Sequence, residues 1–196
     1  FLLGMLSVLP ALGLEIAAGF IQSNFPVFFK STTGIAINAY FFVAFPEEIW
    51  KFLMLLWYAY RKKEFDEPFD GITYSVMVSM GFATAENIMY VFNHGMGVAF
   101  LRMFTAVPAH AFFAVIIGYF LGIQKFYNKK GFGTLGLIAA SVLHGLYDFF
   151  IFNGDNFGIY GGATVSLIAG YYLSKKAIKL HQQDSPFKPD ESQTGF

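Results

Sequence analysis

The chain alternates long apolar runs with short polar breaks. A helix needs about 20 consecutive apolar residues to cross the hydrocarbon core of a bilayer, and six runs of this sequence approach or exceed that length. The breaks contain glycine, proline, asparagine or clustered charge, as connections between helices do. We therefore predict an all-α, polytopic membrane helix bundle with about six transmembrane helices. The predicted spans are residues 1–22, 34–59, 70–93, 98–126, 132–152 and 157–180.

The breaks are short and no internal repeat is visible, so we expect one transmembrane domain over residues 1–180. The remaining residues, 181–196, are polar and carry two prolines. We expect them to form a disordered cytoplasmic tail, with His181 as its first residue. Because the chain opens on Phe1 without a methionine or a basic stretch, we also expect further sequence, and a further span, upstream.

Composition narrows the class of protein. Of 196 residues, 56% are hydrophobic and only 13% are charged, too few for the surface of a soluble domain. The net charge is zero, so nothing indicates a nucleic-acid partner. With no cysteine in the chain, disulfides and thiolate metal ligands are excluded.

Basic residues orient the predicted bundle. They cluster after the second, fourth and sixth spans, and only Lys30 and Arg102 lie on the opposite side. By the positive-inside rule, the ends of the even-numbered spans and both observed termini are cytoplasmic. The clustered residues are Arg61, Lys62, Lys63, Lys125, Lys129, Lys130, Lys175, Lys176 and Lys179.

Eight ionisable residues nevertheless lie inside the predicted spans. Each charged group near the bilayer centre costs about 2.5–3.5 kcal/mol on insertion scales. Interhelical hydrogen bonds can explain one such residue, and this is our interpretation of Glu15, but a set of eight indicates a functional site. They are Glu15, Glu47, Glu48, Lys51, Glu86, His110, His144 and Asp148.

Spacing groups these residues further. Glu47 and Glu48 precede Lys51 by four and three residues, so both carboxylates can reach the lysine along one helical face. His144 and Asp148 are also one helical turn apart, which lets the aspartate orient the imidazole.

Depth and flanking residues add two further expectations. At 1.5 Å per residue, the glutamates, Glu86 and both histidines lie between the midplane and the outer leaflet. Pro46 and Pro108, each just before a polar position, are expected to bend their helices.

Two histidines and several carboxylates from separate helices are ligands that zinc accepts, and a nearby glutamate can activate water. No cysteine or suitably spaced serine offers a nucleophile. These residues alone also permit a proton relay of the kind found in transporters.

Four motifs in order then identify a resemblance. They are "EEIWK" (Glu47, Glu48, Lys51), "FATAE" (Phe82, Glu86), "PAHAFFAVIIGY" (His110) and "HGLYD" (His144, Asp148). Together they resemble the EExxK, FxxxE, histidine-containing and HxxxD motifs of the PrsW-type intramembrane proteases, over about residues 1–180. This family is distantly related to the CAAX prenyl proteases and ABI-type proteins. Those carry arginine four residues after the second glutamate and histidine where this chain has Glu86, which places the chain on the PrsW side.

The resemblance implies hydrolysis of a peptide bond in a membrane-protein substrate, near the extracytoplasmic side of a bacterial cytoplasmic membrane. In such proteases the substrate is an anti-sigma factor, which receives its first cut there. From the resemblance and the chemistry together we expect a catalytic group of Glu47, Glu48, Lys51 and Asp148. We expect Glu86, His110 and His144 to bind a divalent metal, zinc being the first choice.

Three points stay open at the level of sequence. Either Glu47 or Glu48 can be the general base. A metal-free, glutamate-type mechanism, in which the same residues position water and stabilise the oxyanion, is the alternative to zinc. The rival functions are a catalytically inactive membrane scaffold and a proton-coupled transporter, although the internal symmetry typical of transporters is not visible.

Overall fold

The computed structural model describes residues 1–154 and 158–187. All regular secondary structure in these ranges is helical. The α-helices are α1 (Leu2–Asn24), α2 (Pro26–Phe29), α3 (Thr32–Ile37), α4 (Phe45–Trp57), α5 (Pro68–His94), α6 (Met96–Phe104), α7 (Ala106–Phe126), α8 (Phe132–Asn153) and α9 (Thr164–Gln183). Shorter π- and 3₁₀-helical segments are η1 (Asn38–Ala44), η2 (Ala59–Arg61) and η3 (Gly158–Ala163).

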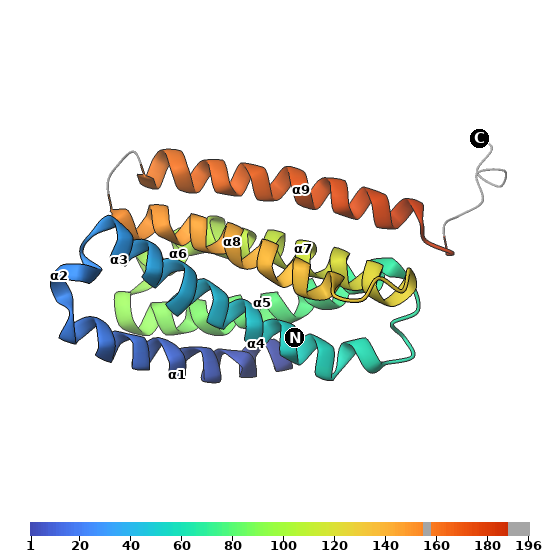
Figure 1. Ribbon diagram of the computed structural model, residues 1–196, viewed down its shortest axis with the longest axis horizontal. Coiled ribbons are helices and arrows are strands. Elements are labelled where there is room, and N and C mark those ends of the chain that lie inside the picture. The colour runs from blue at the N-terminus through green and yellow to red at the C-terminus, as the bar shows by residue number, and fades with distance from the viewer. Residues whose placement is uncertain (155–157, 188–196) are drawn as a thin grey trace.

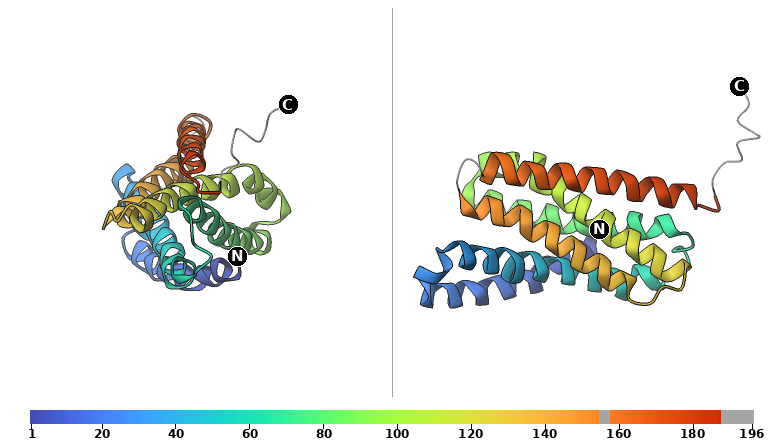
Figure 2. Two further views of the ribbon diagram at one scale, coloured as in Figure 1. Left: turned by 90° about the vertical axis from the view of Figure 1, so that its right-hand side faces the viewer. Right: turned by 45° about the horizontal axis from the view of Figure 1, so that its top comes forward.

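The long helices run roughly along one axis as a single bundle (Figure 1). Helix α1 lies along one edge against α4 and α5, and α9 lies along the opposite edge against α7. Between these edges, α5 packs on α7 and α7 packs on α8. The view along the bundle axis shows α9 at the periphery (Figure 2). The central helices α4, α5, α7 and α8 therefore enclose the interior in which a site can be formed.

Small residues allow α5 and α7 to approach each other closely. A Cβ atom placed on Gly71 would lie 2.3 Å from the carbonyl oxygen of Gly118, and one placed on Gly118 would lie 2.3 Å from that of Gly71. Backbone contact of this kind is how membrane helices pack when no hydrophobic effect drives them together. The two glycines fix the distance between the helices that carry Glu86 and His110.

The prediction of an all-helical membrane bundle is confirmed, but the number of spans is not. Three helical stretches of the described residues are long and apolar enough to cross a membrane: Leu2–Asn24, Met96–Phe126 and Phe132–Asn153. The predicted second span is divided among α3, η1 and α4, and the fourth is interrupted at Thr105 between α6 and α7.

The two prolines explain these interruptions. Pro108 lies in the first turn of α7, where a missing backbone N–H leaves no bond unmade, and Pro46 lies in the first turn of α4, directly after the π-helical η1. The π-helical η1 ends just before Pro46, and the break at Thr105 comes just before Pro108. A break thus precedes Pro108, whereas the chain stays helical from α3 through η1 into α4 and changes from π- to α-helical geometry just before Pro46.

The predicted start of the tail falls inside a helix. Helix α9 continues to Gln183, and His181 is only 1% exposed, stacked on the ring of Tyr119 at 4.5 Å. His181 is therefore a packed residue of the bundle rather than a solvated one. The rest of the predicted tail, 188–196, lies outside the described residues.

Candidate active site

The first turn of α4 carries the paired glutamates, and the lysine lies one turn later. Glu47, Glu48 and Lys51 are all buried. Lys51 Nζ donates to Glu48 Oε1 at 2.6 Å and lies 3.6 Å from Glu47 Oε2. One turn of helix thus holds two carboxylates beside a single ammonium group, as their spacing predicts.

Helices α7 and α8 contribute one imidazole each. His110 and His144 are 3% exposed, and their ring centroids lie 5.1 Å apart with the planes nearly perpendicular. Phe113 stacks on His144 at 4.9 Å, which limits rotation of that ring. The backbone carbonyl of His110 accepts a hydrogen bond from Ser79 Oγ of α5 at 2.9 Å. Both rings are therefore held rigidly in the interior.

Each imidazole has an acidic partner at Nε2 and a partner from α4 at Nδ1. His110 Nε2 lies 3.0 Å from Glu86 Oε2, and His144 Nε2 lies 3.3 Å from Asp148 Oδ2. On the other edge, His110 Nδ1 lies 3.2 Å from Lys51 Nζ, and His144 Nδ1 lies 2.8 Å from Glu48 Oε1.

These contacts fix the tautomer of His110 and the donor atom of His144. An ammonium group can only donate, so His110 Nδ1 accepts from Lys51 and Nε2–H donates to Glu86. A carboxylate can only accept, so His144 Nδ1–H donates to Glu48. The EEIWK turn thereby sets the orientation of both rings.

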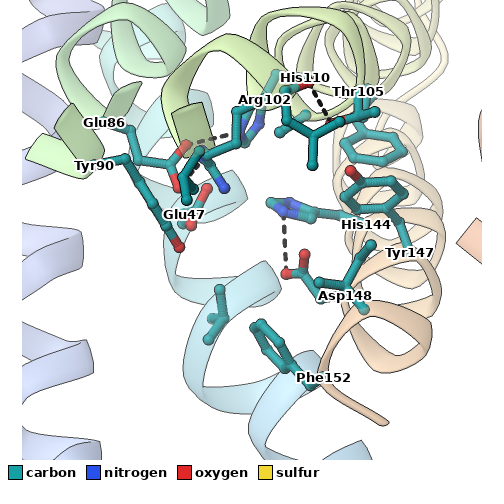
Figure 3. Close-up of a pocket in the computed structure, with 17 residues that line it drawn as sticks. Glu47, Glu86, Tyr90, Arg102, Thr105, His110, His144, Tyr147, Asp148 and Phe152 are labelled. Carbon is teal, nitrogen blue, oxygen red and sulfur yellow. Dashed lines mark hydrogen bonds and ion pairs between the residues drawn. The ribbon is translucent and has the colours of Figure 1, made fainter. Parts of the chain in front are cut away.

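A cavity of about 220 Å³ opens on one side of this network. Glu47, Glu86 and Arg102 approach it from one side, and His144 and Asp148 from the other (Figure 3). Its remaining walls are largely apolar and include Val43, Val98, Leu101, Ile151 and Phe152. Neither Glu48 nor Lys51 lines the cavity. The adjacent glutamates therefore differ in position: Glu47 faces the cavity and Glu48 lies behind it.

The cavity contains a donor set that suits a divalent ion. One ligand-capable atom from each of Glu47, His110 and His144 lies within 4.8 Å of the others. Glu47 Oε2 and Asp148 Oδ2 are buried carboxylate oxygens without a hydrogen-bond partner among the described residues. Two imidazoles and a carboxylate form a ligand set that zinc accepts in hydrolases. These donor types fit a metal ion, and His110 would have to release Lys51 from Nδ1 to act as a ligand, because its Nε2–H donates to Glu86.

All seven residues that the sequence singled out meet in this network. They come from four helices that are distant in sequence. They are Glu47, Glu48, Lys51, Glu86, His110, His144 and Asp148. Glu15 stays half-buried on α1, and no hydrogen bond or ion pair joins it to another described residue.

Sequence reasoning missed Arg102. The distribution of basic residues predicts only that Arg102 lies on the outer side. In the structure, its Nη2 lies 2.6 Å from Glu86 Oε1 and its side chain lines the cavity. A basic residue inside an apolar run, eight positions before His110, is the signal that identifies it.

Comparison with known proteins agrees with the motifs. Residues 1–174 match the family described as PrsW family intramembrane metalloprotease. The chain is 39% identical to Protease PrsW of Oceanobacillus iheyensis over 154 residues, which cover 77% of this chain and 67% of that protein. It is 34% identical to Protease PrsW of Geobacillus kaustophilus over 184 residues, 91% of this chain and 76% of that protein.

A shorter match reaches 44% identity to Protease PrsW of Bacillus subtilis over 110 residues, 55% of this chain and 50% of that protein. No solved structure matches the fold.

Proposed function

Because the chain belongs to the PrsW family of intramembrane metalloproteases, we propose that it cleaves membrane-protein substrates at the cavity beside Glu47. Family membership makes the chain a membrane-embedded peptide hydrolase. The observation that carries the site assignment is the grouping of Glu47, His110 and His144 at a buried cavity.

Glu47 activates the attacking water. It is the glutamate of the pair that faces the cavity, and its Oε2 has no hydrogen-bond partner among the described residues. An unpartnered carboxylate oxygen inside a cavity can accept a hydrogen bond from water and then take its proton. Lys51 Nζ, 3.6 Å away, places a positive charge beside this carboxylate.

Glu48 and Asp148 orient His144. Glu48 accepts from Nδ1–H, and Asp148 Oδ2 lies 3.3 Å from Nε2, which is an electrostatic contact without a hydrogen bond. Positioning of this kind keeps an imidazole aligned on its target without reorganisation during the reaction. His110 is held by Lys51 and Glu86. In the water-activating step, each imidazole would exchange one of these partners for the water or the oxyanion.

A divalent ion, zinc being the first choice, would be held by His110, His144 and Glu47. Glu47, rather than the Glu86 expected from the sequence, completes this set, since both oxygens of Glu86 already have partners. His110 Nδ1 would exchange its contact with Lys51 for the ion. When bound, such an ion would polarise the scissile carbonyl and acidify the water. A carboxylate bound through one oxygen keeps the other free, so Glu47 can still accept the proton.

The substrate is a membrane protein cut near the extracytoplasmic side, such as an anti-sigma factor. Two features support a membrane-embedded substrate: the cavity walls are largely apolar, and the site residues lie in the outer half of the predicted spans. Both observed termini would then be cytoplasmic, in agreement with the distribution of lysine and arginine.

Reconstitution tests this proposal. Purified protein in liposomes is mixed with a single-pass substrate, and the products are identified by mass. We expect cleavage in the extracytoplasmic half of the substrate span, lost in His144→Ala and kept in His94→Ala, whose histidine is exposed at the end of α5. A chelator should abolish cleavage and zinc should restore it. Equal cleavage by His144→Ala would contradict the site, and absence of cleavage by the unaltered protein would favour a scaffold.

A further inference from the structure

Arg102 lies where α6 meets the site. It is in the last turn of α6, three residues before Thr105, where α6 and α7 are separated. Its side chain is 18% exposed and lines the cavity. A cation in the outer half of a membrane bundle is unfavourable unless it has a partner, and Arg102 has two.

Both partners of Arg102 lie on one face of α5. Nη2 lies 2.6 Å from Glu86 Oε1, and the guanidinium carbon lies 3.6 Å from the ring centroid of Tyr90. Glu86 and Tyr90 are one helical turn apart, so the planar guanidinium stacks on the ring while it pairs with the carboxylate. A lysine could supply the charge but neither the flat face nor the paired donors.

Glu86 links Arg102 to His110 of the site. Its two oxygens have different partners: Oε1 has Arg102, and Oε2 accepts from Nε2–H of His110. A carboxylate held at Oε1 cannot rotate without changing the bond at Oε2. The chain of contacts from Arg102 through Glu86 to His110 therefore joins α6, α5 and α7.

The geometry points to Arg102 as a positioning residue that acts through Glu86 to hold the imidazole of His110. This inference rests on the proposed role of His110 in the hydrolytic site. Nothing in the catalytic assignment requires Arg102 to contact substrate.

A purely structural role for Arg102 would be to attach α6 to α5. That attachment has another bond, because Asn87 Nδ2 donates to the carbonyl of Ala99 in α6 at 3.2 Å. Asn87 follows Glu86 in α5, yet it has no contact with His110 among the described hydrogen bonds. Asn87→Ala is therefore a matched control that weakens the α6–α5 contact and leaves the Arg102–Glu86–His110 chain intact.

The first experiment follows the rings directly. The chain has four histidines, so the side-chain spectrum of ¹⁵N-histidine-labelled protein is simple, and the His110 signals are assigned by their loss in His110→Ala. We expect Arg102→Gln to shift the His110 Nε2 signal and Asn87→Ala to leave it in place. An unshifted His110 signal in Arg102→Gln would overturn the inference, whether or not the protein cleaves a substrate.

The second experiment uses the reconstituted protease. Outer residues that hold a site histidine typically contribute 10–100-fold to activity, so Arg102→Gln should lower kcat by roughly that factor with KM changed less than about twofold. Arg102→Lys should recover part of the loss. The double variant Arg102→Gln/Glu86→Gln should be no slower than Glu86→Gln alone. The inference would be overturned if the rate losses of Arg102→Gln and Glu86→Gln multiplied in the double variant. It would also be overturned if Asn87→Ala lowered kcat as much as Arg102→Gln does.

Discussion

Glu48 Oε1 lies 2.8 Å from Nδ1 of His144 and thereby links the EEIWK turn of α4 to the HGLYD turn of α8. The same oxygen accepts from Lys51 at 2.6 Å. Glu48 is fully buried behind the cavity that Glu47 faces. The two adjacent glutamates thus differ in position: Glu47 faces the cavity, and Glu48 contacts Lys51 and His144 behind it.

The buried pair of Glu48 and Lys51 predicts strong coupling in stability. Removing one member of a buried ion pair leaves an uncompensated charge and costs about 3–5 kcal/mol. We expect Lys51→Met and Glu48→Gln each to lower the thermal midpoint in detergent, and the double variant to be less destabilised than the sum of the two. Strictly additive losses would show that the pair does not act as a unit.

Close packing at Gly145 predicts a second coupling. A Cβ atom on Gly145 would lie 2.4 Å from Cδ1 of Tyr40, in the η1 segment that leads to Glu47. Gly145→Ala should push the Tyr40 ring, cost about 1–3 kcal/mol and reduce cleavage by displacing α4.

Shortening Tyr40 to alanine should relieve the clash. We therefore expect Tyr40→Ala/Gly145→Ala to cleave faster than Gly145→Ala alone, measured in the same liposomes. A double variant slower than Gly145→Ala would contradict this account of the contact.

The proposed ligand set predicts the metal content of variants. Purified protein should contain about one zinc per chain by elemental analysis, and His110→Ala or His144→Ala should contain little. His94→Ala serves as the control because His94 is exposed at the end of α5. Zinc bound equally by all four proteins would exclude His110 and His144 as ligands.

His181 predicts a pH dependence of stability outside the site. Burial against Tyr119 lowers the pKa of His181 below its ordinary value of 6.5, while the Pro68 carbonyl and Asp184 oppose this shift. Below pH 6.5 the unfolded chain therefore binds more protons at this residue than the folded chain. The free energy of unfolding should fall as the pH is lowered through 6.5 towards the folded pKa.

His181→Phe, which keeps an aromatic ring on Tyr119, should remove this contribution. The measurement is the thermal midpoint in detergent at a series of pH values between 5 and 8, a range that covers the ordinary titration of histidine. Equal slopes for the two proteins below pH 6.5 would show that His181 is not the responsible group.

The sequence predicted which charged residues lie together better than it predicted the spans. Charged residues inside apolar runs are unfavourable unless they have partners, so Glu47, Glu86, His110 and His144 were visible from hydropathy alone. Their common depth indicated that they meet, and the structure brings them together. The span count required knowing where helices break, and a π-helical segment such as η1 leaves no mark in a hydropathy pattern.

Two features of the site depended on helix orientation. Successive residues of a helix point about 100° apart, so one of Glu47 and Glu48 had to face away from the cavity, but only packing decides which. Arg102 was similarly ambiguous, because a basic residue near the outer end of a span is ordinarily an interfacial residue. Its pairing with Glu86 depends on how α6 folds back on α5.

The cleavage rate of Glu47→Gln tests the central claim most directly. The initial rate on a reconstituted single-pass substrate is compared with that of Glu64→Gln, a matched change at an exposed residue. If Glu47 activates the water, Glu47→Gln should be slower by roughly 10²–10⁴-fold, and Glu64→Gln should match the unaltered protein. A Glu47→Gln rate within a few-fold of the Glu64→Gln rate would contradict the assignment of Glu47.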